Sequence, residues 1–408
     1  MKFVIKWGLL LIPALALAMP AFAQRSPTLS DSQEPGSLII FPKFINDVPV
    51  TTGGDNAVLP RTEIEIGVVC PPGTTPTTTV CFEHQTIKIK FHWVCPGSDD
   101  LTTKFICPET DFEIFASLNG KLAFSADGTP INSNSPRVPA PPCRNGYLIG
   151  WVVDNADRPI KWDGLIGDAV LRGPALVPSA GGLVSTAVEA YTAITVQAAE
   201  DALPTGALLT GTGTPPGSEL PLDGLVGGYK AVSGGTRGKL YADVKYDNVT
   251  ARPVAGVPAP GNALSSTWLV LLTLDVDSGF PNLPTFVDLD FYNESLNTVS
   301  TSNPNFEFHI SAHHHFICWD QIQLSDLDAN LTQAFMGTRK GVVIVSNPHK
   351  VGFAGITNDE PGGVTLIGLV QVFEGVTSPP AFAERSYIFN MYNNSNYVAT
   401  EFEITDDD

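Results

Sequence analysis

Apolar and polar residues alternate along several short segments of this chain, and the alternation predicts β-strands. Glutamates alternate with isoleucines at residues 63–66, lysine and histidine side chains alternate with apolar ones at 87–93, and residues 287–292 repeat the pattern. A period of two places one set of side chains on a buried face and the other in water. We therefore expect half-buried antiparallel strands at these three places.

Three further runs are apolar on both faces, at residues 147–153, 268–274 and 342–345. A strand of this kind belongs in the centre of a sheet that is covered on both sides. Residues 183–201 fit either a helix or a strand, and the β-branched and aromatic residues at 191–196 favour a strand. No stretch shows a helical period over three turns, so the chain predicts an all-β fold.

Four motifs of the first half return in the same order in the second half, which predicts an internal duplication. The pairs are Gly36-Ser37-Leu38-Ile39 with Gly238-Lys239-Leu240-Tyr241, Phe105-Ile106-Cys107 with Phe316-Ile317-Cys318, Gly146-Tyr147-Leu148-Ile149 with Gly341-Val342-Val343-Ile344, and Leu165-Ile166-Gly167 with Leu366-Ile367-Gly368. Their offsets lie between 195 and 211 residues. Chance similarity between alternating strands is the competing explanation.

We expect two β-sandwich domains, at residues 36–202 and 238–408, joined by a linker rich in Pro, Gly and Thr at 203–237. Two packed antiparallel sheets are the simplest way to bury strands that are apolar on one face. Immunoglobulin-like and jelly-roll-like topologies both fit this pattern. The abundance of turn residues, with 37 Gly and 34 Pro, suits strands joined by many turns.

Residues 1–23 have the pattern of a secretory signal peptide: a basic start at 2–6, an apolar run at 8–17 and a small-residue cleavage site at Ala21–Ala23. The apolar run is shorter than the roughly 20 residues of a spanning helix. Cleavage leaves Gln24 first, followed by a flexible N-terminal segment at 24–35. We therefore expect a secreted bacterial protein, extracellular, periplasmic or on the cell surface, with no transmembrane segment after cleavage.

The chain is strongly acidic, with 42 Asp and Glu against 23 Lys and Arg and a formal net charge of −19. Removal of the signal takes away two of the lysines. Such a charge repels nucleic acid and anionic membrane surfaces, so nucleic acid is excluded as a partner. An unknown surface or extracellular partner is expected instead.

An exported chain keeps its cysteines oxidised, so all six are predicted to serve in disulfides. Cys70 and Cys81 bracket one polar loop, and Cys95 and Cys107 bracket the next. We expect one bridge across each loop. Cys143 and Cys318 remain, either paired across the domains or as separate thiols. Six cysteines allow 15 pairings, so this connectivity is a preference.

One histidine cluster offers candidate chemistry. On an extended strand, His309, His313 and His315 point to one face and His314 to the other. With Asp320 nearby, they form a candidate site for a divalent metal ion, for which His313 and His315 are the most feasible pair. The alternative is a solvated polar strand or a packed cluster of neutral imidazoles, and this is the reading we favour, with no cofactor expected.

His313-His314-His315 with Asp320 resembles the metal-binding strand of the cupin family, over residues 313–320 alone. This chain has Asp320 at the place of the family's glutamate, lacks its leading glycine, and offers only Pro348-His349 in place of its second motif. The resemblance implies a metal-dependent enzyme with the histidines as ligands.

Three functions follow from these patterns. The first is a secreted, disulfide-bonded β-sandwich protein with a structural or binding role in the bacterial envelope or extracellular space, without a catalytic residue. The second is a metal-dependent extracellular enzyme that uses His313 and His315. The third is a subunit of a surface polymer or adhesin, joined to its neighbours through exposed strand edges.

Overall fold

The structure is a computed structural model, and it describes the chain in separate ranges. These are residues 35–46, 61–69, 86–97, 107–153, 157, 159–160, 162–172, 176–179, 182–185, 188–197, 208–209, 220–221, 229–230, 239–247, 263–273, 284–293, 309–350, 366–376, 385–393 and 401–402. The predicted signal peptide, the flexible segment up to residue 34, Cys70 and Cys81 lie outside the described residues.

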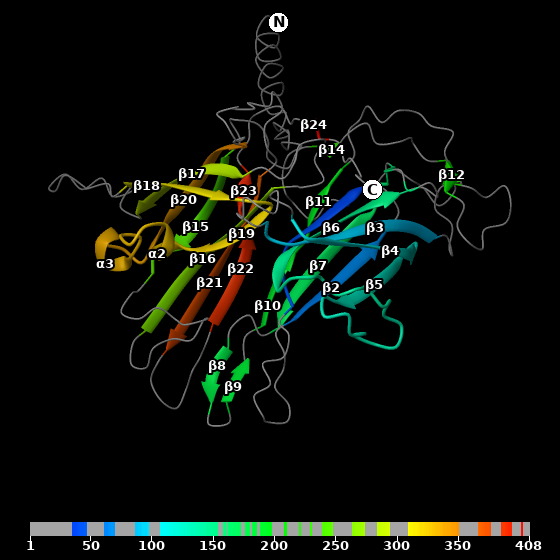
Figure 1. Cartoon of the computed structure of the whole chain (residues 1–408), viewed down its shortest axis with the longest axis horizontal. Coiled ribbons are helices and arrows are strands. Elements are labelled where there is room, and N and C mark those ends of the chain that lie inside the picture. Colours follow the sequence, from blue (N-terminus) through cyan, green and yellow to red (C-terminus); the bar gives the residue numbers. More distant parts are fainter. Residues whose placement is uncertain are drawn as a thin grey trace, which may run out of the picture.

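The first half of the chain forms a sandwich of two antiparallel sheets (Figure 1). One sheet has the order β11-β1-β6-β3-β4, with bounds Ile194–Val196, Leu38–Ile45, Asn145–Val153, Thr86–Val94 and Glu109–Ser117. The other has the order β10-β7-β2-β5, with bounds Val188–Thr192, Leu165–Arg172, Arg61–Val68 and Gly120–Ser125. The all-β sandwich predicted from the alternation is confirmed, and the described residues between 183 and 197 include the strands β10 and β11 and no helix.

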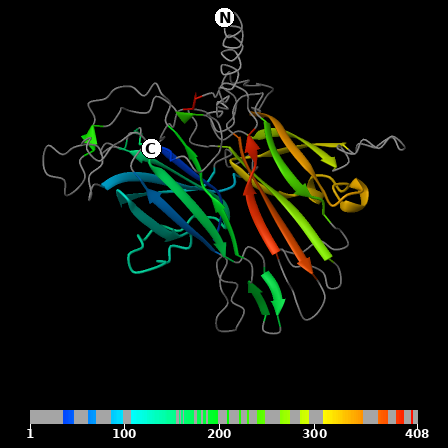
Figure 2. The same cartoon turned by 180° about the vertical axis from the view of Figure 1, so that it is seen from behind.

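The second half forms another two-sheet sandwich. Its sheets have the orders β18-β17-β20-β15-β23, with bounds His309–Phe316, Thr285–Asn293, Lys340–Lys350, Lys239–Lys245 and Tyr392–Asn393, and β19-β16-β21-β22, with bounds Trp319–Gln323, Ala263–Thr273, Leu366–Val376 and Arg385–Asn390. Two single-turn helices, α2 (Leu324–Leu327) and α3 (Gln333–Met336), lie between β19 and β20. Figure 2 shows the two sandwiches side by side from behind.

Three two-stranded sheets complete the described elements. β8 (Leu176–Ser179) pairs with β9 (Gly182–Ser185), β12 (Leu208–Leu209) pairs with β13 (Leu220–Pro221), and β14 (Tyr229–Lys230) pairs with β24 (Glu401–Phe402). The β8–β9 hairpin extends away from both sandwiches (Figure 1). β12, β13 and β14 fall in the segment predicted as a linker.

The second sandwich repeats the strand order of the first. In chain order, β1 to β7, β10 and β11 occupy the same places in their sheets as β15 to β23 do in theirs. Three of the four motif pairs found in the sequence lie on matching strands: β1 with β15, β6 with β20 and β7 with β21. The fourth pair does not match, because Cys107 precedes β4 whereas Cys318 follows β18.

Two glycines show how closely the repeated geometry agrees. A Cβ atom added to Gly146 would lie 2.1 Å from the carbonyl oxygen of Val94, and one added to Gly341 would lie 2.1 Å from that of Tyr292. Both glycines stand at the start of a central strand, β6 or β20, and face the end of the neighbouring β3 or β17. Close approach of the backbones requires glycine at both positions.

The two sandwiches share a buried apolar interface. In β16, Val270 and Leu272 pack in the cluster built mainly by the first half, whereas Leu269 and Leu271 pack in the core of the second sandwich. β21 is divided in the same way. Both strands are therefore covered on both faces, as the continuous apolar run at residues 268–274 predicted for β16.

A buried polar network lies at this interface, around Lys43 at the end of β1. Lys43 is 2% exposed, and its Nζ atom donates to Oε1 of Gln321 at 2.8 Å and to Oε1 of Gln371. Gln371 in turn donates through Nε2 to Oε2 of Glu189 at 2.5 Å. Burial lowers the pKa of Lys43 to about 8, against the opposing effect of the Glu189 charge. A buried cation from the first half thus contacts side chains of the second.

Candidate functional site

The predicted histidine strand is β18, at the edge of the outer sheet of the second sandwich, next to β17. His309, His313 and His315 are exposed on its outer face, and His314 is on the opposite face. His309 Nε2 lies 2.9 Å from Oδ1 of Asp290, and His313 Nδ1 lies 2.7 Å from Oδ1 of Asp288. Two imidazole–carboxylate pairs therefore stand side by side across β17 and β18.

Aromatic rings flank these pairs on the same face. Tyr292 stacks on His309 with ring centroids 4.6 Å apart, and Phe286 stacks between His315 at 5.4 Å and His349 at 5.8 Å. We call this exposed surface, made by the outward residues of β17 and β18 together with His349, the histidine face. It combines carboxylate acceptors, imidazoles and aromatic ring faces on one side of the sheet.

Asp320 does not join the three exposed histidines. Its Oδ2 atom lies 2.8 Å from Nε2 of His314, which points to the other side of the sheet.

Partial burial alone would raise the pKa of Asp290, but hydrogen bonds from Ser311 and His309 and the charge of Lys239 outweigh it, so this pKa lies below its ordinary value. Asp290 is therefore a carboxylate at neutral pH.

In the first sandwich, β3 and β4 correspond to β17 and β18; the outward side chains of β4 are exposed, but those of β3 are buried. Lys88 is 8% exposed, Lys90 6% and His92 3%. The alternation in residues 87–93 predicted a face open to water, so this expectation is wrong. Partners compensate for the burial of Lys88, which bonds to Glu113 at 2.8 Å and to Asp157.

A cluster of three metal-ligand side chains lies at the end of this buried face. His92 of β3 faces Asp111 and Glu109 of β4, and one donor atom from each of the three falls within 4.8 Å of the others. Sequence reasoning missed this cluster. The spacing of Glu109 and Asp111, two residues apart, places both on one face, but their register with His92 requires the structure.

The cysteines pair differently from the prediction. The structure joins Cys95 to Cys143 and Cys107 to Cys318. The expected bridge between Cys95 and Cys107 is wrong, as is a pairing of Cys143 with Cys318. Cys95 follows β3 and Cys107 precedes β4, but each is bonded to a cysteine outside this pair of strands. The bridge between Cys107 and Cys318 links the two sandwiches.

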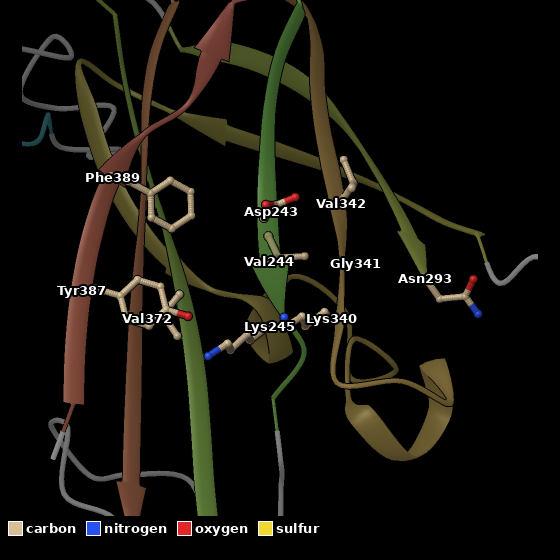
Figure 3. Close-up of a pocket in the computed structure, with 10 residues that line it drawn as sticks. All are labelled: Asp243, Val244, Lys245, Asn293, Lys340, Gly341, Val342, Val372, Tyr387 and Phe389. Carbon is tan, nitrogen blue, oxygen red and sulfur yellow. The ribbon is translucent and has the colours of Figure 1, made fainter. Parts of the chain in front are cut away.

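A groove of about 550 Å³ opens at the edge of the second sandwich (Figure 3). It is lined by Val244 and Lys245 of β15 and by Tyr387 and Phe389 of β22, among others. β23 pairs with Leu240 and Tyr241, and within the described ranges no strand pairs with residues 242–244 of β15 on that side. Lys245 lies over the ring of Tyr387, 5.0 Å from its centroid.

None of the helices in the described ranges has the length and hydropathy that a bilayer-spanning helix requires. No family model matches the chain, and no curated protein matches it. Among solved structures, one titled "Crystal Structure of Thermotoga maritima 1070" has 8% sequence identity and a TM-score of 0.22. The match covers 41% of this chain and 97% of the other.

Proposed function

We propose that this chain is a secreted bacterial protein with a binding or structural role in the envelope or the extracellular space. The disulfides between Cys95 and Cys143 and between Cys107 and Cys318 support an oxidising compartment. The signal-like residues 1–23 support export. The repeated strand order of the two sandwiches supports an origin by internal duplication.

The observation that carries the binding role is the exposure of the histidine face. The side chain of His313 on β18 is 79% exposed and that of His309 41%, and Asp288 of the neighbouring β17 is 37% exposed, whereas β3, the strand that matches β17, has its outward side chains buried. The interface and the bridge from Cys107 to Cys318 hold the two sandwiches together. The histidine face therefore lies on two linked sandwiches, where it can bind a partner that offers hydrogen-bond donors, acceptors or aromatic rings.

Export is tested on protein recovered from outside the cytosol. We expect N-terminal sequencing to begin at Gln24, and peptide mapping without reduction to recover the peptide pair that contains Cys107 and Cys318. An uncleaved N-terminus together with reduced cysteines would refute the proposed compartment.

The binding role is tested by co-sedimentation with purified cell-envelope fragments and with extracellular polysaccharide. The test variant replaces Tyr292, His309 and His313 by alanine, and the control variant replaces the exposed Phe115 of the first sandwich by serine. We expect the test variant to lose binding and the control to keep it. Equal binding by both variants, or no binding by the wild type, contradicts the assignment of the histidine face.

A metal-dependent extracellular enzyme is the second candidate, favoured by the pairing of His309 with Asp290 and of His313 with Asp288. The assay is elemental analysis of untagged protein, joined to hydrolysis and oxidation assays on common extracellular substrates. This candidate requires an activity that disappears in a His313→Ala/His315→Ala variant together with bound zinc, copper, iron or manganese. Metal without such an activity does not support it.

A subunit of a surface polymer or adhesin is the third candidate. It is favoured by the groove beside residues 242–244 of β15, which among the described strands pair with β20 on one side alone, since such a strand edge can accept a strand from another chain. Light scattering at several protein concentrations measures this directly. A molecular mass that rises with protein concentration supports the polymer, and a constant monomer mass refutes it.

A further inference from the structure

The hairpin of β3 and β4 places an imidazole and two carboxylates at one point. His92 pairs directly with Asp111 in the register of the two strands, and Glu109 stands two residues before Asp111 on the same face. The Nδ1 atom of His92 lies 2.8 Å from Oδ1 of Asp111 and 3.7 Å from Oε2 of Glu109. Both carboxylates therefore converge on one nitrogen of the ring.

The histidine at the centre of this cluster is buried and lacks a hydrogen bond. His92 is 3% exposed, and neither of its ring nitrogens has a hydrogen-bond partner among the described residues. The approach to Asp111 is close in distance but does not have hydrogen-bond geometry. Burying an unpaired polar atom costs about 1–3 kcal/mol, so such an atom requires an explanation.

We propose that His92, Glu109 and Asp111 bind one divalent transition-metal ion, with zinc as the ion that fits best. Zinc accepts imidazole nitrogen and carboxylate oxygen at about 2.0–2.2 Å, which places neighbouring ligand atoms a little over 3 Å apart. The two measured separations bracket that value. The two carboxylates neutralise the charge of the ion.

The exposure of the three ligand side chains decides from which side solvent reaches the site. The side chains of Glu109 and Asp111 are 45% and 38% exposed, so the site is open to solvent on the carboxylate side. Water completes the coordination there. On the other side, Trp151 stacks on the imidazole with ring centroids 4.6 Å apart and an interplanar angle of 14°, which fixes the plane of the ring.

Both disulfides hold the backbone next to the ligands. Cys95 follows His92 by three residues and is bonded to Cys143, while Cys107 precedes Glu109 by two residues and is bonded to Cys318. The backbone N–H of Cys95 also donates to the carbonyl oxygen of Pro108 at 2.9 Å. The ligands are thus held in place before the ion arrives, which reduces the ordering cost of binding.

The next outward carboxylate of β4 already has an ion-pair partner. Glu113, the next outward residue of β4 after Asp111, bonds to Lys88 at 2.8 Å. This makes Glu113 a matched control: it is an acidic residue of the same strand and the same face, but it is bound to a lysine and not to the imidazole.

The experiment measures zinc binding by titration calorimetry on untagged, disulfide-bonded protein after treatment with EDTA. The test variants are Glu109→Gln and Asp111→Asn, chosen because their side chains are partly exposed and the fold tolerates them better than a change of His92. The controls are Glu113→Gln and His313→Ala. Circular dichroism and the thermal midpoint in EDTA verify that each variant is folded.

We expect one zinc ion per wild-type chain. Each test variant should weaken affinity by more than the roughly 100-fold that removal of an outer partner of a metal ligand costs. Both controls should bind as the wild type does. X-ray absorption of the zinc-loaded protein should show nitrogen and oxygen ligands without sulfur, because the neighbouring cysteines are in disulfides.

Three results would overturn the proposal. The first is no binding of zinc, manganese, cobalt or nickel by the wild type. The second is full affinity in a Glu109→Gln/Asp111→Asn double variant. The third is loss of binding in His313→Ala, which assigns the ion to the histidine face instead.

Discussion

Replacement of Lys43 by methionine should destabilise the protein strongly. The side chain is fully buried at the interface, where its Nζ atom donates to Gln321 and Gln371 and faces the charge of Glu189. Methionine keeps most of the volume but removes the cation, and it leaves the Glu189 carboxylate buried without it. Gln371 links Lys43 to Glu189, and removing one of two interacting buried charges costs about 3–5 kcal/mol.

A second substitution separates the lost charge from the lost packing. In a Lys43→Met/Glu189→Gln variant both buried charges are gone, and we expect most of the lost stability to return, because replacing a whole buried pair is often neutral. The coupling energy from this double-mutant cycle should be at least about 2 kcal/mol, near the upper part of the range for residues in one hydrogen-bond network.

The same lysine predicts how stability changes with pH. Its pKa is about 8 in the folded protein and 10.5 when unperturbed, so between these values the unfolded chain binds more protons. The free energy of unfolding then rises with pH in that window. Between pH 7.5 and 9.5, the titration of Lys43 should raise the free energy of unfolding of the wild type by about 2 kcal/mol. This increase should be absent in Lys43→Met.

Urea denaturation followed by tryptophan fluorescence, with disulfides intact, measures these quantities at each pH. The reasoning fails if Lys43→Met costs less than about 1 kcal/mol, which is the range of ordinary substitutions. It also fails if wild type and variant keep a constant difference from pH 7.5 to 9.5, since the lysine would then titrate as in water.

Three further predictions concern the scaffold. Replacing Cys107 and Cys318 by serine removes a bridge across 211 residues, and we expect a loss of about 2–5 kcal/mol and two denaturation transitions in place of one. Gly146→Ala and Gly341→Ala should each cost about 1–3 kcal/mol by urea denaturation, because the added methyl meets a backbone carbonyl oxygen; a neutral result at either glycine contradicts the close packing. Asp247→Asn should lower the thermal midpoint, because this buried carboxylate accepts two backbone N–H groups and a glutamine amide, and an amide has one acceptor oxygen instead of two; an unchanged midpoint contradicts this network.

Local patterns were sufficient to predict the strands of this protein. The period of two in residues 287–292 and the continuous apolar runs that became β6, β16 and β20 are read from neighbours in the chain. The faces of His313 and His314 follow from the same alternation. The recurrence of short motifs also indicated two halves, and three of the four pairs lie on matching strands.

What covers each face was decided only by the tertiary structure. Alternation shows that Lys88 and Lys90 share a face with His92, but burial depends on what packs against that face from elsewhere. The same holds for Lys43, whose burial comes from contact with the second sandwich. A charged residue in a short strand reads as solvent-exposed until its distant partners are known.

The disulfides show the same division between local and distant information. Proximity in sequence favoured a bridge between Cys95 and Cys107, yet each bonds to a cysteine farther along the chain. Strand formation depends on residues two positions apart, whereas sheet order, register and disulfide partners depend on residues up to 211 positions apart. The sequence alone therefore determined which segments are strands, and the tertiary structure decided which side chains meet.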